Sequence, residues 1–426
     1  MKTGLKTLLT VCASLAVFQT NSLAQTIIIK ANKVVTNTNL GVIDDGTILI
    51  KDGQVTAIST NANYDNDLTI SGDNYWVTPG IFAAYTNLGL VEVNAVSSTN
   101  DTRAGDAKAS LTLRASDSFN PHSTSIPVSR LGGITHAAIA PGSGKTIFGG
   151  QGMVTSTDGR LDFDDKRRFI FVQLGESGAR TAGGSRSASV GYLRSALSDA
   201  ANISTRYTRN ADHGEVLNRY EAGTLNKALI GQIPILIGVD KATDILGILK
   251  LQRNRLDIII VGASEGWMVA DQLAAANVSV IIDPLESLPY GFEDLGSRLD
   301  NAKILQDAGV KMAFMTRTAT GSGAQNIRLL PQHAGNAVAN GLSWDAAFKA
   351  ITLNPASMFG SKFLGQLQAG RRANLVVWDG DPLEITSTPI AIFIDGKRQD
   401  LTSRQTELRD RYHPNNTGNA LYGYRP

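Results

Sequence analysis

Apolar, β-branched runs recur through the middle of the chain, and segments with a helical pattern separate them. Runs that are apolar on both faces are typical of parallel strands covered by helices. Between them, apolar residues recur at helical spacing, as at Leu299, Ala302 and Leu305. The seven runs are residues 81–84, 134–140, 169–174, 233–239, 258–261, 278–282 and 312–315. Seven strands are one fewer than a closed (β/α)8 barrel needs, so this pattern alone leaves a doubly wound open sheet as the alternative.

The two ends of the chain have a different pattern, of short strands joined by tight turns. Residues 47–51 and 54–58 flank Asp52-Gly53, a pair that tolerates the positive φ of a type I′ hairpin turn. Near the other end, a β-rich run at 373–378 is followed by 392–394 and a second Asp-Gly pair. Each end alone has too few strands to be stable, so we expect both ends to build one small β-sandwich.

The first residues have the pattern of an export signal. Lys2 and Lys6 precede an apolar stretch at 8–18, and Ser22-Leu23-Ala24 gives the small-x-small pattern that precedes a cleavage site. A short first helix of the folded domain is the alternative. Because charge, length and cleavage pattern agree, we expect cleavage after Ala24 and a periplasmic or secreted protein. No other stretch approaches the ~18 apolar residues that a membrane span needs.

Composition mainly excludes functions. Without the two leader lysines, the 40 basic residues become 38, which balances the 38 acidic ones. A balanced chain without a long basic run gives no reason to expect nucleic acid or an anionic membrane as a partner. The single cysteine, Cys12, lies in the leader, so the mature chain has no thiol for disulfides, catalysis or metal binding.

Several longer stretches resemble the amidohydrolase superfamily. TPGIFAAYTNLG at 78–89 is similar to its first barrel strand, where Pro-Gly leads into a His-x-His metal pair. AITLNPASMFG at 350–360 resembles its last barrel helix, for which Ser343 is the expected N-cap of a helix at 344–359. GQLQAGRRANLVVWDGDPLEITSTPIAIFIDGK at 365–397 resembles its return to the β-sandwich, and the stretches at 183–197 and 233–249 are similar to secreted imidazolonepropionase-like members.

This resemblance covers nearly all of residues 25–400 and implies a TIM (β/α)8 barrel with a small composite β-sandwich. The expected division is a signal peptide at 1–24, sandwich strands at 25–78, the barrel at 79–361, further sandwich strands at 362–402 and a C-terminal tail at 403–426. The implied activity is hydrolysis of carbon–nitrogen bonds other than peptide bonds. In the family, a divalent cation lowers the pKa of a bound water, and an aspartate on the last strand moves its proton. Since barrels of this family commonly pair, a homodimer is also implied.

The chain departs from the family pattern where the metal ligands belong. The His-x-His pair aligns with Tyr85 and Asn87, and the strand-five histidine aligns with Gly238. The following strand ends in Gly-Ala-Ser, and Arg317 most nearly replaces the proton-shuttling aspartate. An arginine is no base at neutral pH and repels a nearby cation. We therefore predict that the metal centre is lost and that no cofactor is bound.

Other residues offer two ways to rebuild a site. The histidines, at 122, 136, 213, 333 and 413, show no pair at i,i+2 or i,i+4. Glu176, Asp240 and Asp283 each follow a predicted strand, so together they could form an all-oxygen site for Mg²⁺ or Ca²⁺. Without a metal, Glu176 is a candidate general base. Ser264 is a candidate nucleophile, because Gly-Ala-Ser-Glu-Gly after a strand matches the Gly-x-Ser-x-Gly elbow of α/β-hydrolases.

The sequence thus predicts a barrel mouth that binds a small-molecule ligand or substrate. Its expected lining is Tyr85, Asn87, Glu176, Gly238, Ser264 and Arg317. The planar guanidinium of Arg317 suits a carboxylate on that ligand. The alternatives are a hydrolase with a rebuilt site and a non-catalytic binding or scaffolding protein.

Overall fold

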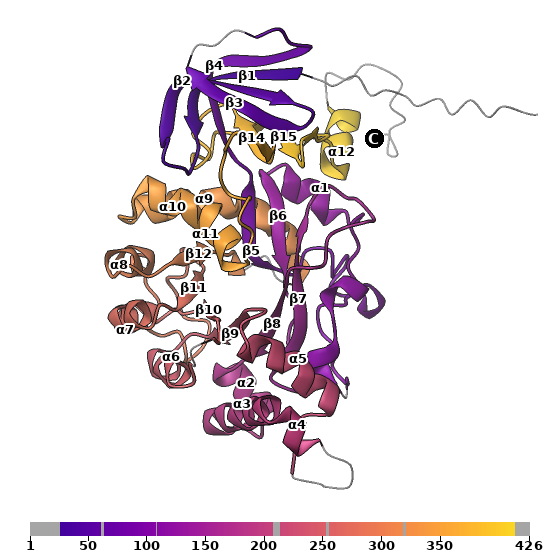
Figure 1. Cartoon of the computed structure of the whole chain (residues 1–426), viewed down its shortest axis with the longest axis vertical. Helices are drawn as coiled ribbons and strands as arrows, with labels where there is room; N and C mark the ends of the chain where they lie inside the picture. The colour runs from indigo at the N-terminus through magenta and orange to yellow at the C-terminus, as the bar shows by residue number, and fades with distance from the viewer. Residues whose placement is uncertain are drawn as a thin grey trace, which may run out of the picture.

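The computed structural model describes residues 26–60, 64–107, 109–207, 214–252, 255–317 and 321–413. The predicted signal peptide and the end of the predicted tail lie outside these residues. The described chain forms two eight-stranded sheets, one in a β-domain and one in a barrel surrounded by helices (Figure 1). No helix among the described residues is long and apolar enough to cross a membrane.

Strands from both ends of the chain build the β-domain, as the hairpin patterns predicted. The sheet order is β13-β3-β2-β1-β4-β14-β15-β16, and the antiparallel pair of β4 and β14 joins the two ends. Only two residues separate β13, at one edge, from β14, in the sixth position, so the sheet folds over on itself around a buried apolar core. The strands are β1 (Thr26–Val35), β2 (Val42–Lys51), β3 (Gln54–Thr60), β4 (Leu68–Pro79), β13 (Arg371–Arg372), β14 (Leu375–Trp378), β15 (Pro389–Ile394) and β16 (Lys397–Arg398).

The barrel sheet contains all seven strands predicted from the apolar runs. They are β5 (Ile81–Thr86), β6 (Ile134–Ile139), β8 (Arg168–Gln173), β9 (Ile235–Val239), β10 (Ile258–Gly262), β11 (Ser279–Ile282) and β12 (Met312–Phe314). The eighth strand, β7 (Phe148–Ser156), is inserted between β6 and β8 and runs antiparallel to both. At the seam β5 lies beside β12, and the Phe82 amide donates to the carbonyl of Ile351 at 2.8 Å. The predicted combination of barrel and β-domain is therefore confirmed, with one strand reversed.

Helices cover the outside of the barrel and close its amino-terminal end. The side chain of Ser343 accepts from the amide of Ala346, so the predicted N-cap is confirmed. The single helix predicted at 344–359 is broken after Ala350, and Pro355 lies in the first turn of the second piece. The α-helices are α1 (Ser125–Arg130), α2 (Gly175–Thr181), α3 (Arg186–Ala201), α4 (Ile203–Arg206), α5 (Arg219–Leu229), α6 (Ala242–Leu249), α7 (Ala270–Ala275), α8 (Asn301–Asp307), α9 (Leu330–Ala339), α10 (Trp344–Ala350), α11 (Leu353–Met358) and α12 (Arg404–Tyr412). Short 3₁₀ segments are η1 (Ser97–Thr99), η2 (Ser110–Thr112), η3 (Ala115–Asp117), η4 (Gly266–Val269) and η6 (Gly321–Leu329).

The barrel interior is filled by side chains rather than open. Alternate residues of its strands form one buried cluster, which α11 and the residue after it close at the end that faces the β-domain. The ring of Phe359 stacks on Phe82 at 5.9 Å and packs against Phe169 at 5.0 Å between centroids. This plug leaves the carboxyl ends of the strands as the open end of the barrel, where barrels of this kind hold their sites.

Candidate functional site at the barrel mouth

A cavity of about 390 Å³ lies at the carboxyl ends of the barrel strands. This volume lies within the range that small-molecule sites occupy. Residues from the ends of β5, β8, β9, β10 and β12, from α2 and from the loop before α8 form its wall. They are Tyr85, Phe171, Gln173, Glu176, Ser177, Arg180, Gly238, Val239, Asp240, Val261, Gly262, Tyr290, Gly291, Glu293, Asp294, Met315 and Arg317.

Arg317 is held among three carboxylates at one side of this cavity. Its guanidinium lies 3.0 Å from Asp240, 3.0 Å from Asp294 and 2.5 Å from Glu286. It also stacks over the ring of Tyr290, 5.2 Å from the centroid. Because three carboxyl groups surround one guanidinium, its charge is already compensated inside the protein.

The pKa values of Glu286 and Asp294 shift in opposite directions in this arrangement. Burial raises the pKa of Glu286 to about 8, against the pull of Arg317, and the charge on Asp240 acts in the same direction as burial. For Asp294, burial also raises the pKa, but the amides of Gly291 and Tyr290 and the guanidinium together hold it below the ordinary value. One guanidinium cannot balance three negative charges, so Glu286 keeps its proton near neutral pH.

Ser264 lies behind this cluster rather than in the cavity. It is 3% exposed, and its hydroxyl donates to Asp240 Oδ1 at 2.6 Å. His333 pairs with a different carboxylate, that of Asp283, at 3.0 Å. The elbow-like turn does contain a residue at positive φ, Ala263 at +49°. However, the serine is a buried donor to an aspartate, so its predicted place on the cavity wall is wrong.

Two further glutamates line the cavity. Glu176 lies in the first turn of α2, and its amide donates to Glu293 Oε2 at 2.6 Å. Burial raises the pKa of Glu293; the amide of Glu176 lowers it, and the charges of Asp240, Glu176 and Asp294 raise it further. The wall thus carries four acids (Glu176, Asp240, Glu293 and Asp294) against two basic residues, Arg180 and Arg317.

The remaining predicted residues divide between the cavity and the core. Tyr85 and Gly238 line the cavity as expected, and burial raises the pKa of the Tyr85 hydroxyl. A Cβ at position 238 would lie 2.9 Å from Gln173 Oε1, so a larger residue here would displace the end of that side chain. Asn87 does not line the cavity as expected, because it is 6% exposed and donates to the Ala140 carbonyl at 2.6 Å.

The side chains at the strand ends do not fit a divalent cation. Among the described residues, no group of three or more histidine, cysteine, aspartate or glutamate side chains is arranged to hold a metal. Glu176, Asp240 and Asp283 do not converge on one point: Asp240 binds Arg317 and Ser264. Asp283 accepts from the Arg317 amide at 2.8 Å and pairs with His333. The predicted all-oxygen site is therefore not formed.

Sequence reasoning missed most of the partners of Arg317. Glu286, Tyr290 and Asp294 all belong to the irregular segment between β11 and α8, where no periodic pattern places a side chain. One signal was available: a buried arginine needs acidic partners. The concentration of acids between residues 283 and 300 could have supplied them.

Comparisons with known proteins agree with this architecture. A sequence model described as the amidohydrolase family matches residues 255–402. The amidohydrolase tasK of Hapsidospora irregularis is 23% identical over 394 residues, which cover 83% of this chain. The chain spans 40% of the length of that relative.

Solved structures share the fold over most of the chain. An amidohydrolase from Thermotoga maritima superposes with a TM-score of 0.76 at 22% identity, covering 87% of this chain and 99% of the other. A prolidase solved with N-methylphosphonate-L-proline gives a TM-score of 0.55 at 13% identity, covering 88% and 99%. Together, the matched family model, the curated relative and the shared fold support assigning this chain to the amidohydrolase superfamily.

Proposed function

We propose that this protein binds a small molecule bearing a positively charged group in its barrel mouth and does not carry out metal-assisted hydrolysis. The observation that carries the proposal is the guanidinium of Arg317 set among Asp240, Glu286 and Asp294. The fold is that of a hydrolase family. However, the carboxyl groups that a metal would need as ligands already bind the guanidinium of Arg317.

The argument against a metal is electrostatic. A divalent ion beside Arg317 would be repelled by a fixed positive charge in a partly buried site, where screening is weak. It would also have to remove Asp240 from Arg317 and Ser264, which both bind that carboxylate. Leaving the guanidinium without its partners would cost several kcal/mol, on the order of the loss of a buried ion pair.

The charge of the cavity wall supports a cationic ligand. Arg317 was expected to attract a carboxylate, but its own carboxylates already neutralise it. Glu176 and Glu293 also line the cavity; burial, and after it the charges of Asp240, Glu176 and Asp294, raise the pKa of Glu293, and a bound cation would favour its ionised form. The rings of Tyr85, Phe171 and Tyr290 supply faces to which an ammonium group is attracted.

A binding series tests the proposal. Thermal melts and calorimetric titrations would compare primary amines, guanidines and quaternary ammonium compounds with carboxylates of the same size. We expect the cations to raise the melting temperature and Glu293→Gln to remove most of that shift. Glu384→Gln, which changes an exposed glutamate elsewhere, is the matched control. If the carboxylates stabilise the protein and the cations do not, the proposal that the ligand is positively charged is refuted.

A second candidate is hydrolysis of carbon–nitrogen bonds without a metal. The family match favours it, and the cavity wall carries the carboxyl groups of Glu176 and Glu293, the second of which accepts from the backbone amide of the first. Turnover of cyclic amides or dipeptides that survives chelation and is abolished by Glu176→Gln would favour this enzyme over the binding protein. Stoichiometric zinc that remains after dialysis would overturn both metal-free proposals.

We also propose that the protein is exported, on the pattern of residues 1–24. Amino-terminal sequencing of the protein from the periplasm or the medium is expected to begin at Gln25. Recovery of the full-length chain in the cytoplasm would contradict export.

A further inference from the structure

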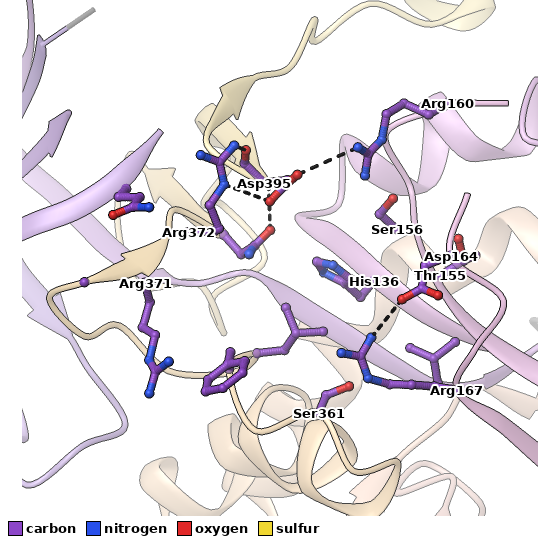
Figure 2. A pocket seen from close by; sticks show the side chains of 16 residues that line it. His136, Thr155, Ser156, Arg160, Asp164, Arg167, Ser361, Arg371, Arg372 and Asp395 are labelled. Atoms are coloured by element: carbon purple, nitrogen blue, oxygen red, sulfur yellow. Dashed lines mark hydrogen bonds and ion pairs between the residues drawn. The ribbon is translucent and has the colours of Figure 1, made fainter. Parts of the chain in front are cut away.

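A second cavity, of about 330 Å³, lies where the closed end of the barrel meets the β-domain (Figure 2). The barrel contributes residues from β6, from the end of β7, from the segment before β8 and from the turn after α11. The β-domain contributes Gln54, Arg371, Arg372, Asn374 and Asp395. This site is separate from the barrel mouth, because the buried plug around Phe359 fills the barrel between them.

The wall of this cavity has an excess of positive charge. Four arginines (Arg160, Arg167, Arg371 and Arg372) face two aspartates, Asp164 and Asp395. Two of the arginines are firmly paired. Arg372 binds Asp395 at 2.9 Å, and Arg160 binds Asp158 at 2.5 Å.

The other two arginines are less compensated. The guanidinium of Arg371 lies over the ring of Phe363 at 3.9 Å and has no acidic partner among the described residues. Arg167 reaches Asp164 at only 3.4 Å, through one nitrogen. In Figure 2, Arg371 lies on the β-domain side and Arg167 on the barrel side. Two cations that face one cavity from two domains are placed to bind one anion together.

Two hydroxyl groups at the same cavity also lack partners. Thr155 Oγ1 and Ser361 Oγ make no hydrogen bond, although each residue is 3% exposed and lines the cavity. A buried hydroxyl without a partner is costly, so the arrangement is incomplete as it stands.

His136 adds a polar but uncharged group to the wall. Burial lowers its pKa to about 4, and its Nδ1 lies 3.1 Å from Thr135 Oγ1. The positive charge of the cavity therefore comes from its arginines. The ring stacks against Phe82, which fixes it in the wall.

We propose that this cavity is a binding site for a small multivalent oxyanion, held between Arg167 of the barrel and Arg371 of the β-domain. Phosphate monoesters and polycarboxylates share the required chemistry, since guanidinium groups pair with either through two parallel hydrogen bonds. Such a ligand would bridge the two domains and stabilise their contact.

Inorganic phosphate and citrate are the probes, titrated into the full protein by calorimetry against sodium chloride of equal ionic strength. We expect saturable binding that weakens about tenfold or more in Arg371→Gln and in Arg167→Gln, as for loss of a charge-assisted hydrogen bond. Tighter binding of phosphate would identify the ligand as a phosphate compound, and tighter binding of citrate as a polycarboxylate. The ring-proton resonance of His136 is expected to shift on saturation.

Arg398→Gln is the matched control, because it removes the same charge from an exposed strand outside the cavity. We expect it to bind as the wild type does. Melting curves in chloride show whether each variant is folded, and the two arginines lie in different domains, so one folding defect cannot explain both losses. No binding in the wild type, or equal binding in all variants and no shift at His136, would overturn the proposal.

Discussion

At the scale of single residues, Arg317 determines the character of the barrel mouth. Its position at the end of the last strand followed from the sequence, because the strand pattern there is clear. Its partners did not follow. Asp294 and Glu286 come from an irregular loop whose path depends on tertiary contacts, such as the bonds that Asp294 accepts from the amides of Tyr290 and Gly291. The sequence therefore revealed which charge is present but not that it is neutralised.

Glu286→Gln tests whether three carboxylates share one guanidinium. Burial raises the pKa of Glu286 from 4.5 to about 8, so the folded state keeps a proton that the unfolded chain loses above pH 4.5. That contribution to wild-type stability is complete below pH 4.5 and is lost as the pH rises to about 8. We expect the free energy of unfolding of the variant to gain about 1–3 kcal/mol relative to wild type between pH 5 and pH 8.5.

Urea denaturation at the two pH values measures this difference. Glu384→Gln, at an exposed position, is expected to follow the wild type at both. If Glu286→Gln and the wild type change in parallel with pH, Glu286 is ionised throughout and the proton lies elsewhere in the cluster.

At the scale of elements, the seven parallel strands were predictable and the eighth was not. Parallel strands covered on both sides are continuous apolar runs, which stand out in the sequence. β7 contains Gly149, Gly150 and Gly152, and glycine is depleted in strands, so no continuous apolar run marks this strand in the sequence. The structure gives the reason for Gly152: a Cβ there would lie 2.1 Å from the Phe169 ring and 2.6 Å from the Ile139 carbonyl.

Gly152→Ala is therefore expected to destabilise the protein by about 2–3 kcal/mol, as overpacking in a filled core does. The glycine has no positive φ, so the expected effect is steric rather than conformational. Gly191→Ala in α3 is the matched control, since nothing lies within 4 Å of the added Cβ. There alanine should stabilise by about 0.5–1 kcal/mol, because it favours the helix. Chemical denaturation measures the change in the free energy of unfolding for both variants. If Gly152→Ala has the same effect as Gly191→Ala, β7 can move away from β8.

At the scale of the whole molecule, opposite charges are separated to the two ends of the barrel. The mouth has four acids against two arginines, whereas the cavity beside the β-domain has four arginines against two aspartates. These two imbalances are equal and opposite, and the formal net charge of the whole chain is +2. A balanced composition excluded a broad basic surface but could not reveal two small sites of opposite sign, because only the fold determines which charges meet.

The β-domain also depends on the whole chain, since neither end supplies a complete sheet. β14 pairs with β4, and the indole of Trp378 donates to Thr78 Oγ1 at 2.9 Å in the buried interior. Leu375, Val377 and Phe393 fill the same core as β1 and β2. Truncation after Gly370 removes β13–β16 and exposes both this core and the edge of β4, so we expect an insoluble chain without a cooperative melt.

Truncation after Ser403 is the control for that experiment, because α12 contains no buried residue. Its melting temperature is expected to stay within about 2 °C of the full chain, as for changes confined to the surface. Differential scanning calorimetry and solubility of the two truncated proteins give the comparison. A soluble Gly370 truncation that melts cooperatively near the full-length temperature would show that β1–β4 are stable without the carboxyl-terminal strands. The β-domain would then be an independent unit rather than a sheet completed by both ends.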